Sequence, residues 1–275
     1  MTFLIIFGFI ALIIILRIWI NIRNKNDLII HFNPHTRLFR NRLALDQINI
    51  ISRHSRYYRN LPERLKVYYE DRIIRFIDNK DFISKGDITI TEEKKLLIAD
   101  SAVKLTFGLR KFMFEQFEKI IIFKGEFYSD FSHSRNKGET NPAGAIVFSW
   151  KDIVEGDLKE DDGINLGIHE FAHALMVENL GPQGYDDEYF LDKIPSFEDF
   201  YEDTEMLANV RDHHLFREYA FRNKMEFFAI SCEQFFEVPE KMKDGIPKLY
   251  ELICTMLNQN PLAILSPEIA SRRVE

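Results

Sequence analysis

Residues 165–179 read NLGIHEFAHALMVEN and contain the pattern HEFAH, with His169 and His173 four positions apart. On an α-helix, positions i and i+4 share a face, so both imidazoles can reach one zinc ion. Glu170 lies about 100° around the helix from His169, where its carboxylate can accept a proton from a water that zinc activates. The spacing therefore predicts a helix that carries two zinc ligands and a general base.

The flanking sequence supports a helix at this place. Asp161-Asp162-Gly163 predicts its start. The helix also has an apolar side for burial, formed by Ile168, Phe171, Ala172 and Leu175. A shuffled chain of this composition would contain the HExxH pattern roughly 0.02 times. A buried helix with two incidental histidines is therefore the less favoured alternative.

A catalytic zinc site needs a third protein ligand and an open fourth position. The longer motif of the metzincins would place that ligand on the same helix, but it needs Gly and His where this chain has Met176 and Asn179. The candidates elsewhere are Glu178, His213, His214, Glu226 and Glu233. Glu178 lies about 140° around the helix from the second histidine and is expected to point away. His213 and His214 lie in the charged stretch RDHHLFREY, where a solvated pair is the simpler interpretation.

Glu226 and Glu233 lie in MEFFAISCEQFFEVP, an otherwise strongly apolar helix that Pro239 ends. A buried carboxylate on such a helix requires a partner, and a metal ion is one. The two glutamates are about 10 Å apart along the helix, so they cannot both bind the same ion. Residue chemistry favours Glu226 and leaves Glu233 and the two histidines as alternatives.

Outside this region the hydrophobic pattern predicts mostly helices with a small sheet, an α+β fold. Leu61-Pro62-Glu63 opens a helix, because proline fits the first turn and glutamate favours the positive helix end. Its apolar stripe consists of Leu65, Tyr69, Ile73 and Phe76. Gly86 is expected to close this helical unit, and Thr91 to cap a second helix that ends near Gly108.

Two short β-branched segments, 119–123 and 145–150, are expected to form strands. Between them, residues 125–143 are rich in Gly, Ser, Asn and Pro and read as a long loop. Helical patterns dominate again from about residue 163 to the end. The sequence shows no internal repeat.

The composition describes a folded chain. Its 275 residues are 46% apolar and 29% charged, enough for a sizeable core and incompatible with a disordered or collagen-like chain. With two cysteines, Cys232 and Cys254, a disulfide scaffold is excluded and a thiolate-rich zinc site is disfavoured. We expect both cysteines to be buried thiols.

The first residues form a separate hydrophobic segment. Residues 2–16 read TFLIIFGFIALIIIL, with Arg17 and Trp19 immediately after. Fifteen apolar residues are fewer than the roughly 20 of a typical span. However, Arg17 can reach the headgroups and Trp19 suits the interface. We predict an uncleaved transmembrane helix. A signal peptide, which needs a preceding basic region and a cleavage site, and a buried core helix are the alternatives.

The net charge of −7 is unevenly distributed. Residues 17–75 hold 13 Lys and Arg against 5 Asp and Glu, whereas residues 76–275 hold 23 against 38. A basic stretch beside an apolar segment favours the cytoplasmic side and is attracted to the anionic inner leaflet. We therefore expect a single-pass protein whose main domain faces the cytoplasm. Because the arginines are scattered and the whole chain is acidic, no nucleic-acid partner is expected.

Four blocks of the chain resemble, in order, the Mlc titration factor family of bacterial zinc-dependent peptidases, which shares its catalytic architecture with anthrax lethal factor. The blocks are YYRNLPERLKVYYEDRIIRFIDNKDF, ITITEEKKLLIADSAVKLTFGL, GAIVFSWKDIVEG and DGINLGIHEFAHAL. The resemblance extends from Tyr57 to Pro267 and is far more specific than the HExxH pattern alone. It implies a zincin-like fold, hydrolase activity on peptides and one Zn²⁺ per chain.

The resemblance also implies roles for individual residues. It implies His169 and His173 as zinc ligands, Glu170 as catalytic base, and Glu226 as third ligand, the first residue of a Glu-x-Phe-Ala pattern that reads EFFA here. Tyr219, seven residues before Glu226, corresponds to a tyrosine of the family. A phenol so placed can donate a hydrogen bond to the developing oxyanion.

The chain departs from the family at Met176, where the family usually has Asp. If that Asp supports the histidine ligands, another group must orient His173 here, because methionine is a poor hydrogen-bond acceptor. We expect Met176 to change the rate of peptide hydrolysis or the affinity for the metal, but not which residues bind the metal.

The sequence predicts three regions: a transmembrane anchor (1–22), a basic juxtamembrane linker with short helices (23–60) and a zinc metallopeptidase domain (61–275). The last divides into a helical part (61–110) and a catalytic part (111–275). The expected substrates are peptides or proteins, with small peptides cleaved from the amino end suggested by the resemblance. The alternatives are a zinc-containing module that sequesters a protein partner such as a transcriptional repressor, and a membrane scaffold with a degenerate site.

Overall fold

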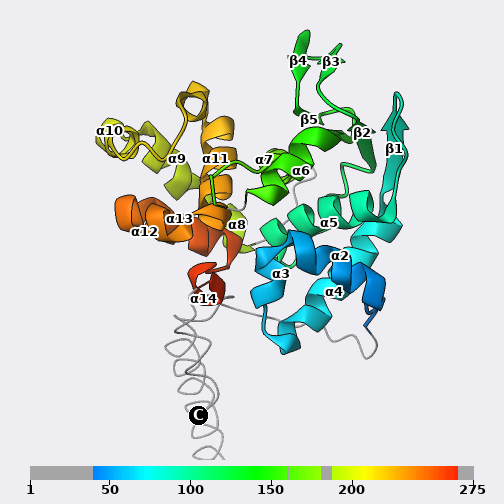
Figure 1. Ribbon diagram of the computed structural model, residues 1–275. Coiled ribbons are helices and arrows are strands. Elements are labelled where there is room, and N and C mark those ends of the chain that lie inside the picture. The colour runs from blue at the N-terminus through cyan, green and yellow to red at the C-terminus, as the bar shows by residue number, and fades with distance from the viewer. Residues whose placement is uncertain (1–39, 160, 181–187, 266–275) are drawn as a thin grey trace, which may run out of the picture.

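A computed structural model describes residues 40–159, 161–180 and 188–265 (Figure 1). The expected anchor, residues 1–22, lies outside the described residues, as does the linker up to residue 39. Within the described ranges no helix is both long and apolar enough to cross a membrane. The transmembrane anchor and the cytoplasmic orientation therefore stay predictions.

Helices make up most of the described chain. The first five are α2 (Leu45–His54), α3 (Arg56–Asn60), α4 (Glu63–Asn79), α5 (Glu92–Thr106) and α6 (Trp150–Leu158). The later ones are α7 (Leu166–Leu180), α8 (Glu188–Leu191), α9 (Ile194–Glu202), α10 (Thr204–Asp212), the 3₁₀ helix η2 (Glu218–Arg222), α11 (Lys224–Glu237), α12 (Pro239–Gly245), α13 (Pro247–Leu257) and α14 (Leu262–Leu265). Figure 1 shows α7 between the N-terminal helices and the C-terminal ones.

The sheet contains four strands in the order β1 (Asp81–Lys85), β2 (Lys119–Phe123), β6 (Ala145–Ser149) and β5 (Gly138–Asn141). The first three are parallel, and β5 runs antiparallel to β6 at one edge. A separate antiparallel hairpin, β3 (Phe127–Ser129) and β4 (Ser134–Asn136), projects from the molecule (Figure 1). The prediction of a mainly helical α+β fold with a small sheet is confirmed.

Several local predictions are confirmed. The apolar stripe of α4 is buried, and it consists of Leu65, Tyr69, Ile73 and Phe76. Thr91 caps α5 as expected, because its side chain accepts a hydrogen bond from the N–H of Lys94. Cys232 and Cys254 are buried free thiols.

Two predictions about the sheet are wrong. Gly86 does not close a helical unit, because α4 ends at Asn79 and residues 81–85 form the edge strand β1. Residues 125–143 are not a loop, since they contain β3, β4 and β5. All four residues of β5 are only half-buried and three of them are polar, so the strand lacks the apolar alternation by which buried strands are recognised. The second predicted strand also ends one residue early, at Ser149.

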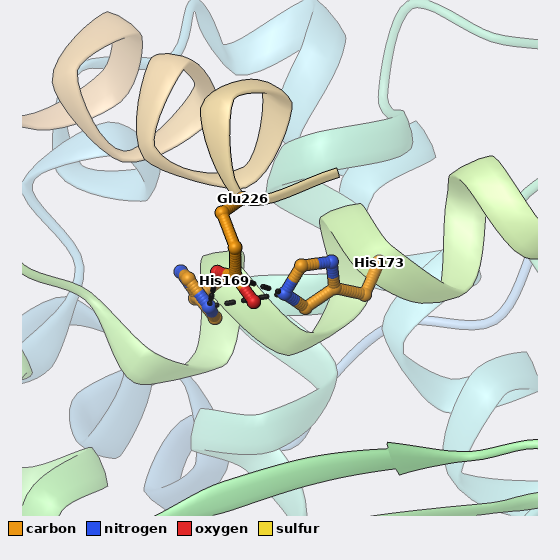
Figure 2. Close-up of side chains that lie close together, drawn as sticks. All are labelled: His169, His173 and Glu226. Atoms are coloured by element: carbon orange, nitrogen blue, oxygen red, sulfur yellow. Dashed lines mark hydrogen bonds and ion pairs between the residues drawn. The ribbon is translucent and has the colours of Figure 1, made fainter. Parts of the chain in front are cut away.

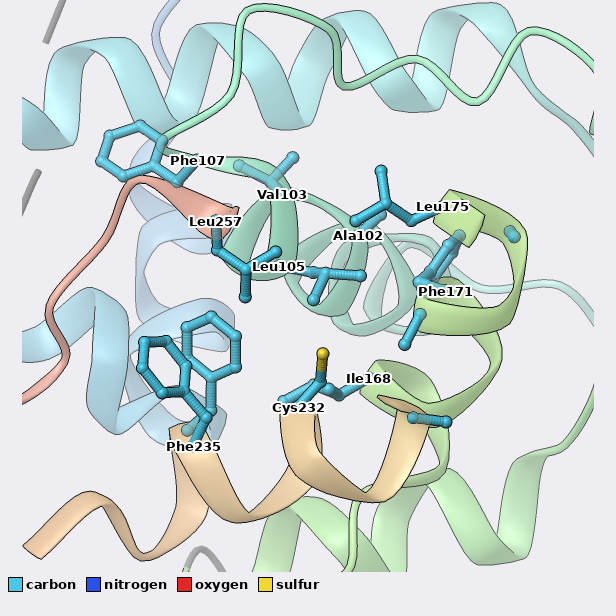
Figure 3. Packing of buried hydrophobic residues seen from close by; sticks show 14 of the residues in the cluster. Ala102, Val103, Leu105, Phe107, Ile168, Phe171, Leu175, Cys232, Phe235 and Leu257 are labelled. Atoms are coloured by element: carbon cyan, nitrogen blue, oxygen red, sulfur yellow. The ribbon is translucent and has the colours of Figure 1, made fainter. Parts of the chain in front are cut away.

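The hydrophobic core joins α5, α7 and α11, the helices that position the site (Figure 3). Phe171 of α7 is fully buried, as are Ala102 of α5 and Cys232 of α11. Full burial of a side chain as large as Phe171 stabilises a fold by about 1.5–3 kcal/mol. The same core includes Tyr57 and Tyr58 of α3. The two helices that carry the candidate site are therefore held against each other by continuous packing.

Candidate metal centre

Helix α7 begins at Leu166, three residues later than Asp161-Asp162-Gly163 would place its start. The side chain of Asn165 accepts a hydrogen bond from the N–H of Ile168 at 3.0 Å, as an N-cap residue does. Asp162 instead accepts from the N–H of Ile164 within the preceding turn, where Gly163 has a φ of +75°. Asn165, and not the acidic pair, therefore caps the helix.

The side chains of His169 and His173 on α7 and Glu226 on α11 point toward one another (Figure 2). The two Nε2 atoms are 3.1 Å apart. Oε2 of Glu226 lies 3.2 Å from Nε2 of His169 and 3.5 Å from Nε2 of His173. The side chains of His169, His173 and Glu226 are 11%, 15% and 14% exposed, respectively, so the cluster is partly open to solvent.

The three donor atoms fit a single metal ion. Ligand atoms bound at about 2.0–2.1 Å to a tetrahedral zinc ion lie about 3.3 Å from one another, close to the three distances observed. Oε2 of Glu226 is buried, and within the described part of the chain it has no hydrogen-bond partner of suitable geometry. Two facing imidazole nitrogens and an orphaned carboxylate oxygen form a site that could hold a cation, with donors suited to zinc.

The same cluster attracts protons strongly when no cation neutralises it. Burial lowers the pKa of His169, but the neighbouring carboxylates of Glu226 and Glu233 outweigh it and raise the pKa to about 10. Burial raises the pKa of Glu226, but the imidazoles of His169 and His173 outweigh it, so the pKa lies well below its ordinary value. Without a cation, His169 is therefore protonated and Glu226 is ionised at neutral pH, and a bound metal ion would replace the proton of His169.

Glu233 orients the His169 ring from the side opposite the cluster. Its Oε1 lies 2.7 Å from Nδ1 of His169. Arg217 donates two hydrogen bonds to the same carboxylate, at 2.6 and 3.2 Å. The backbone N–H of Asn165 donates a third at 2.8 Å. With Nδ1 bonded to Glu233, the lone pair of Nε2 is the one available to a metal ion.

Glu170 is buried beside the cluster and is held by strand β5. The Oγ1 of Thr140 donates to Oε2 of Glu170 at 3.0 Å and to the backbone carbonyl of the same residue at 2.8 Å. A Cβ atom on Gly138 would overlap Oε1 of Glu170, so only glycine fits there. Burial raises the pKa of Glu170 above its ordinary value, although both nearby histidines oppose the rise.

Tyr219, on η2, approaches the cluster from outside and is 42% exposed. Its hydroxyl donates to Oε1 of Glu226 at 3.1 Å, and Arg222 lies over its ring at 5.0 Å from the centroid. Burial, together with the charge of Glu226, raises the pKa of the phenol, so it stays protonated at neutral pH. The sequence places this tyrosine at the site only through the family resemblance.

The other predicted candidates lie elsewhere. Glu178 points away from the cluster, as expected, and accepts a hydrogen bond from the N–H of Gln116 at 2.7 Å. His213 and His214 are exposed. Met176 is fully buried in the core.

Sequence reasoning missed four residues that position the site: Gly138, Thr140, Asn165 and Arg217. Gly138 and Thr140 lie at Glu170, 32 and 30 positions away in the chain. Asn165 and Arg217 contact Glu233, 68 and 16 positions away. No local pattern marks such contacts. The only available signal was the glycine at 138 in a segment read as a loop.

A helix bearing His-Glu-x-x-His that receives a carboxylate from a second helix, beside a small mixed sheet, defines a metallopeptidase-like protein. The chain belongs to the family described as glucose-regulated metallo-peptidase M90, whose model matches residues 31–257. The family predicted from the four sequence blocks is thereby confirmed.

Curated relatives agree with this membership. Mlc titration factor A of Yersinia enterocolitica is 31% identical over 137 residues, which cover 46% of this chain and 49% of that protein. The Yersinia pestis protein of the same name is 31% identical over 140 residues, or 48% and 50% of the two chains. The chain thus spans about half the length of these relatives. The protein slr2042 of Synechocystis sp. is 23% identical over 213 residues, which cover 72% of this chain and 78% of the relative.

Proposed function

We propose that this protein is a zinc-dependent peptidase in which His169, His173 and Glu226 hold one zinc ion. The observation that supports the proposal most directly is the convergence of three donor atoms at spacings of 3.1, 3.2 and 3.5 Å, with a buried carboxylate oxygen that otherwise has no hydrogen-bond partner among the described residues. Two imidazoles and one carboxylate leave a fourth tetrahedral position for water or substrate.

A zinc ion held by these three residues would supply Lewis acidity, which would polarise a carbonyl and lower the pKa of water toward about 7. Glu170 takes the proton of the attacking water and delivers it to the leaving amine. Thr140 holds one carboxylate oxygen of Glu170 at 3.0 Å and so keeps the base in one orientation. The protonated phenol of Tyr219 donates a hydrogen bond to the oxyanion that forms during attack.

Replacing Glu170 by Gln tests the proposal in the full chain. We expect the variant to bind one zinc per chain as the wild type does, and to hydrolyse peptides at least 100-fold more slowly. Glu178→Gln is the matched control, because Glu178 lies two turns further along the same helix and contacts Gln116, not the cluster. Equal hydrolysis by wild type and Glu170→Gln would contradict the assignment of the base.

A second candidate function is the sequestration of a protein partner. The relatives called Mlc titration factor A favour it, since their name refers to a titration of Mlc. A module of this kind would hold zinc as a structural ion and would need no base. Full zinc occupancy without peptide hydrolysis, together with partner binding that Glu170→Gln leaves unchanged, would favour this function over a peptidase.

A further inference from the structure

The candidate metal centre opens into a cleft of about 520 Å³. The three side chains of the cluster, His169, His173 and Glu226, all line it, and so does Glu170. Most of the remaining lining comes from the β3–β4 hairpin, β5, η2 and the start of α11. A substrate that reaches the metal centre through this cleft therefore contacts β5, the edge strand that packs against α7.

One carboxylate in the lining of this cleft has no part in the proposed mechanism. Three glutamates line the cleft, and the mechanism uses Glu170 as base and Glu226 as metal ligand. The third is Glu139 of β5, which is half-buried. Its neighbours in the strand, Gly138 and Thr140, both border Glu170. Because consecutive residues of a strand are about 3.3 Å apart, the backbone of Glu139 lies next to the base.

The carboxylate of Glu139 is held in place by neutral amide groups. Nδ2 of Asn136 donates to its Oε2 at 3.1 Å, and Nδ2 of Asn141 donates to its Oε1 at 2.9 Å. Asn136 is fixed in turn by the hairpin, because it donates to Oγ of Ser132 and accepts from Oγ of Ser134, both at 2.8 Å. Both oxygens of Glu139 are thus oriented without any neutralisation of their charge.

Glu139 has no cationic partner in the part of the chain that the structure describes. Arg222 is the one Lys or Arg side chain in the described lining of the cleft, and it lies over the ring of Tyr219. A carboxylate in a partly desolvated cleft attracts a positive charge more strongly than one in bulk water. A single carboxylate suits an ammonium or guanidinium group, which donates hydrogen bonds, better than a metal ion, which needs several ligands.

We infer that Glu139 is a specificity-determining residue, whose carboxylate binds a positively charged group of the substrate near the bond that is cleaved. The inference rests on the proposed peptidase function. The charged group is either the free α-amino group of the peptide or a Lys or Arg side chain, because both donate charge-assisted hydrogen bonds to a carboxylate. Since Asn136 and Asn141 already orient the carboxylate, little side-chain freedom is lost when such a group binds.

The test uses the zinc-loaded full chain and one mixed-sequence peptide library in four forms. The amino end is either free or acetylated, and every Lys and Arg is either kept or replaced by norleucine, an uncharged residue of similar length. Mass spectrometry of the products gives the relative kcat/KM for each form. We expect the wild type to prefer peptides with the charged group about 10–100-fold, as a hydrogen bond between charged groups would produce.

Glu139→Gln keeps the shape of the side chain and removes its charge, so the ratio of kcat/KM between charged and uncharged peptides should fall toward one. Because both kinds of peptide are measured with the same preparation, this ratio does not depend on how much of the variant is folded. Glu139→Lys reverses the charge and should favour the uncharged peptides. Asp130→Asn is the matched control, since Asp130 is exposed on the β3–β4 hairpin and does not line the cleft, and it should keep the wild-type ratio.

The four forms of the library also identify the source of the charge. Loss of the preference on acetylation indicates the α-amino group, and loss on replacement of Lys and Arg indicates a side chain; either result supports the inference. Equal rates for all four forms with the wild type, or an unchanged preference in Glu139→Gln, would overturn the inference and leave the peptidase function intact. If the zinc-loaded wild type cleaves none of the four forms, the proposed function itself is wrong.

Discussion

Glu233 Oε1 lies 2.7 Å from Nδ1 of His169, on the opposite side of the imidazole from the Nε2 atom that faces Glu226. Glu226 and Glu233, both on helix α11, thus contact the two nitrogens of the same imidazole ring. Seven positions separate them, and this spacing puts one carboxylate in the cluster and the other behind it. Glu233 therefore fixes the orientation of the His169 ring.

Glu233→Gln should therefore weaken zinc binding. A neutral amide accepts a weaker hydrogen bond from His169 and leaves Arg217 without its counter-charge, so we expect zinc affinity to fall about 10–100-fold. Competition titration with a chelator measures this change. Glu237→Gln is the control, because Glu237 is buried one turn further on and contacts Asn165 but not His169. Equal losses in both variants would indicate a general effect on α11.

Gly138→Ala should impair hydrolysis while zinc stays bound. The added Cβ would overlap Oε1 of Glu170 and force that carboxylate from its place, so we expect kcat to fall at least tenfold. Zinc content and kcat are measured on the same preparation. Gly125→Ala is the matched control, since a Cβ there has no neighbour within 4 Å. Normal kcat in Gly138→Ala would mean that the observed position of Glu170 is not needed for proton transfer.

Tyr219→Phe should lower kcat about 100-fold with little change in zinc affinity, because removal of one oxyanion donor has effects of this size. Steady-state kinetics and a zinc titration distinguish two roles of the hydroxyl. If zinc affinity falls and kcat at saturating zinc does not, the hydroxyl serves to position Glu226, to which it donates at 3.1 Å. Tyr128→Phe on the exposed hairpin should leave both quantities unchanged.

Glu178 should make the fold less stable as pH rises. Burial raises its pKa from 4.5 to about 7. Between these values the folded chain binds more protons than the unfolded chain, so the contribution of Glu178 to the free energy of unfolding is full below pH 4.5 and is lost as pH rises through about 7.

Glu178→Gln removes this pH dependence and keeps an oxygen that can accept from the N–H of Gln116. Relative to wild type, the variant should gain about 3 kcal/mol of unfolding free energy between pH 4.5 and pH 8. Urea denaturation at several pH values measures the difference. A difference that is constant with pH would show that Glu178 does not titrate in this window.

The features that were predicted correctly from the sequence are local ones. The stripe of α4, the cap at Thr91, the strand at 119–123 and the helix bearing His169 and His173 all depend on residues within a few positions of one another. The edge strand β5 was not predictable in this way. Its residues pair on one side only and are half-buried, so they show no apolar alternation, although two of them determine where Glu170 lies.

The sequence by itself determined that one helix carries two imidazoles and a carboxylate on neighbouring faces, because helical geometry relates positions i, i+1 and i+4 directly. It left Glu226, Glu233 and two histidines as possible third ligands on residue chemistry. Only the tertiary structure decided that Glu226 joins the cluster and Glu233 lies behind His169. That choice depends on how α11 packs against α7, a contact between residues more than 50 positions apart in the chain.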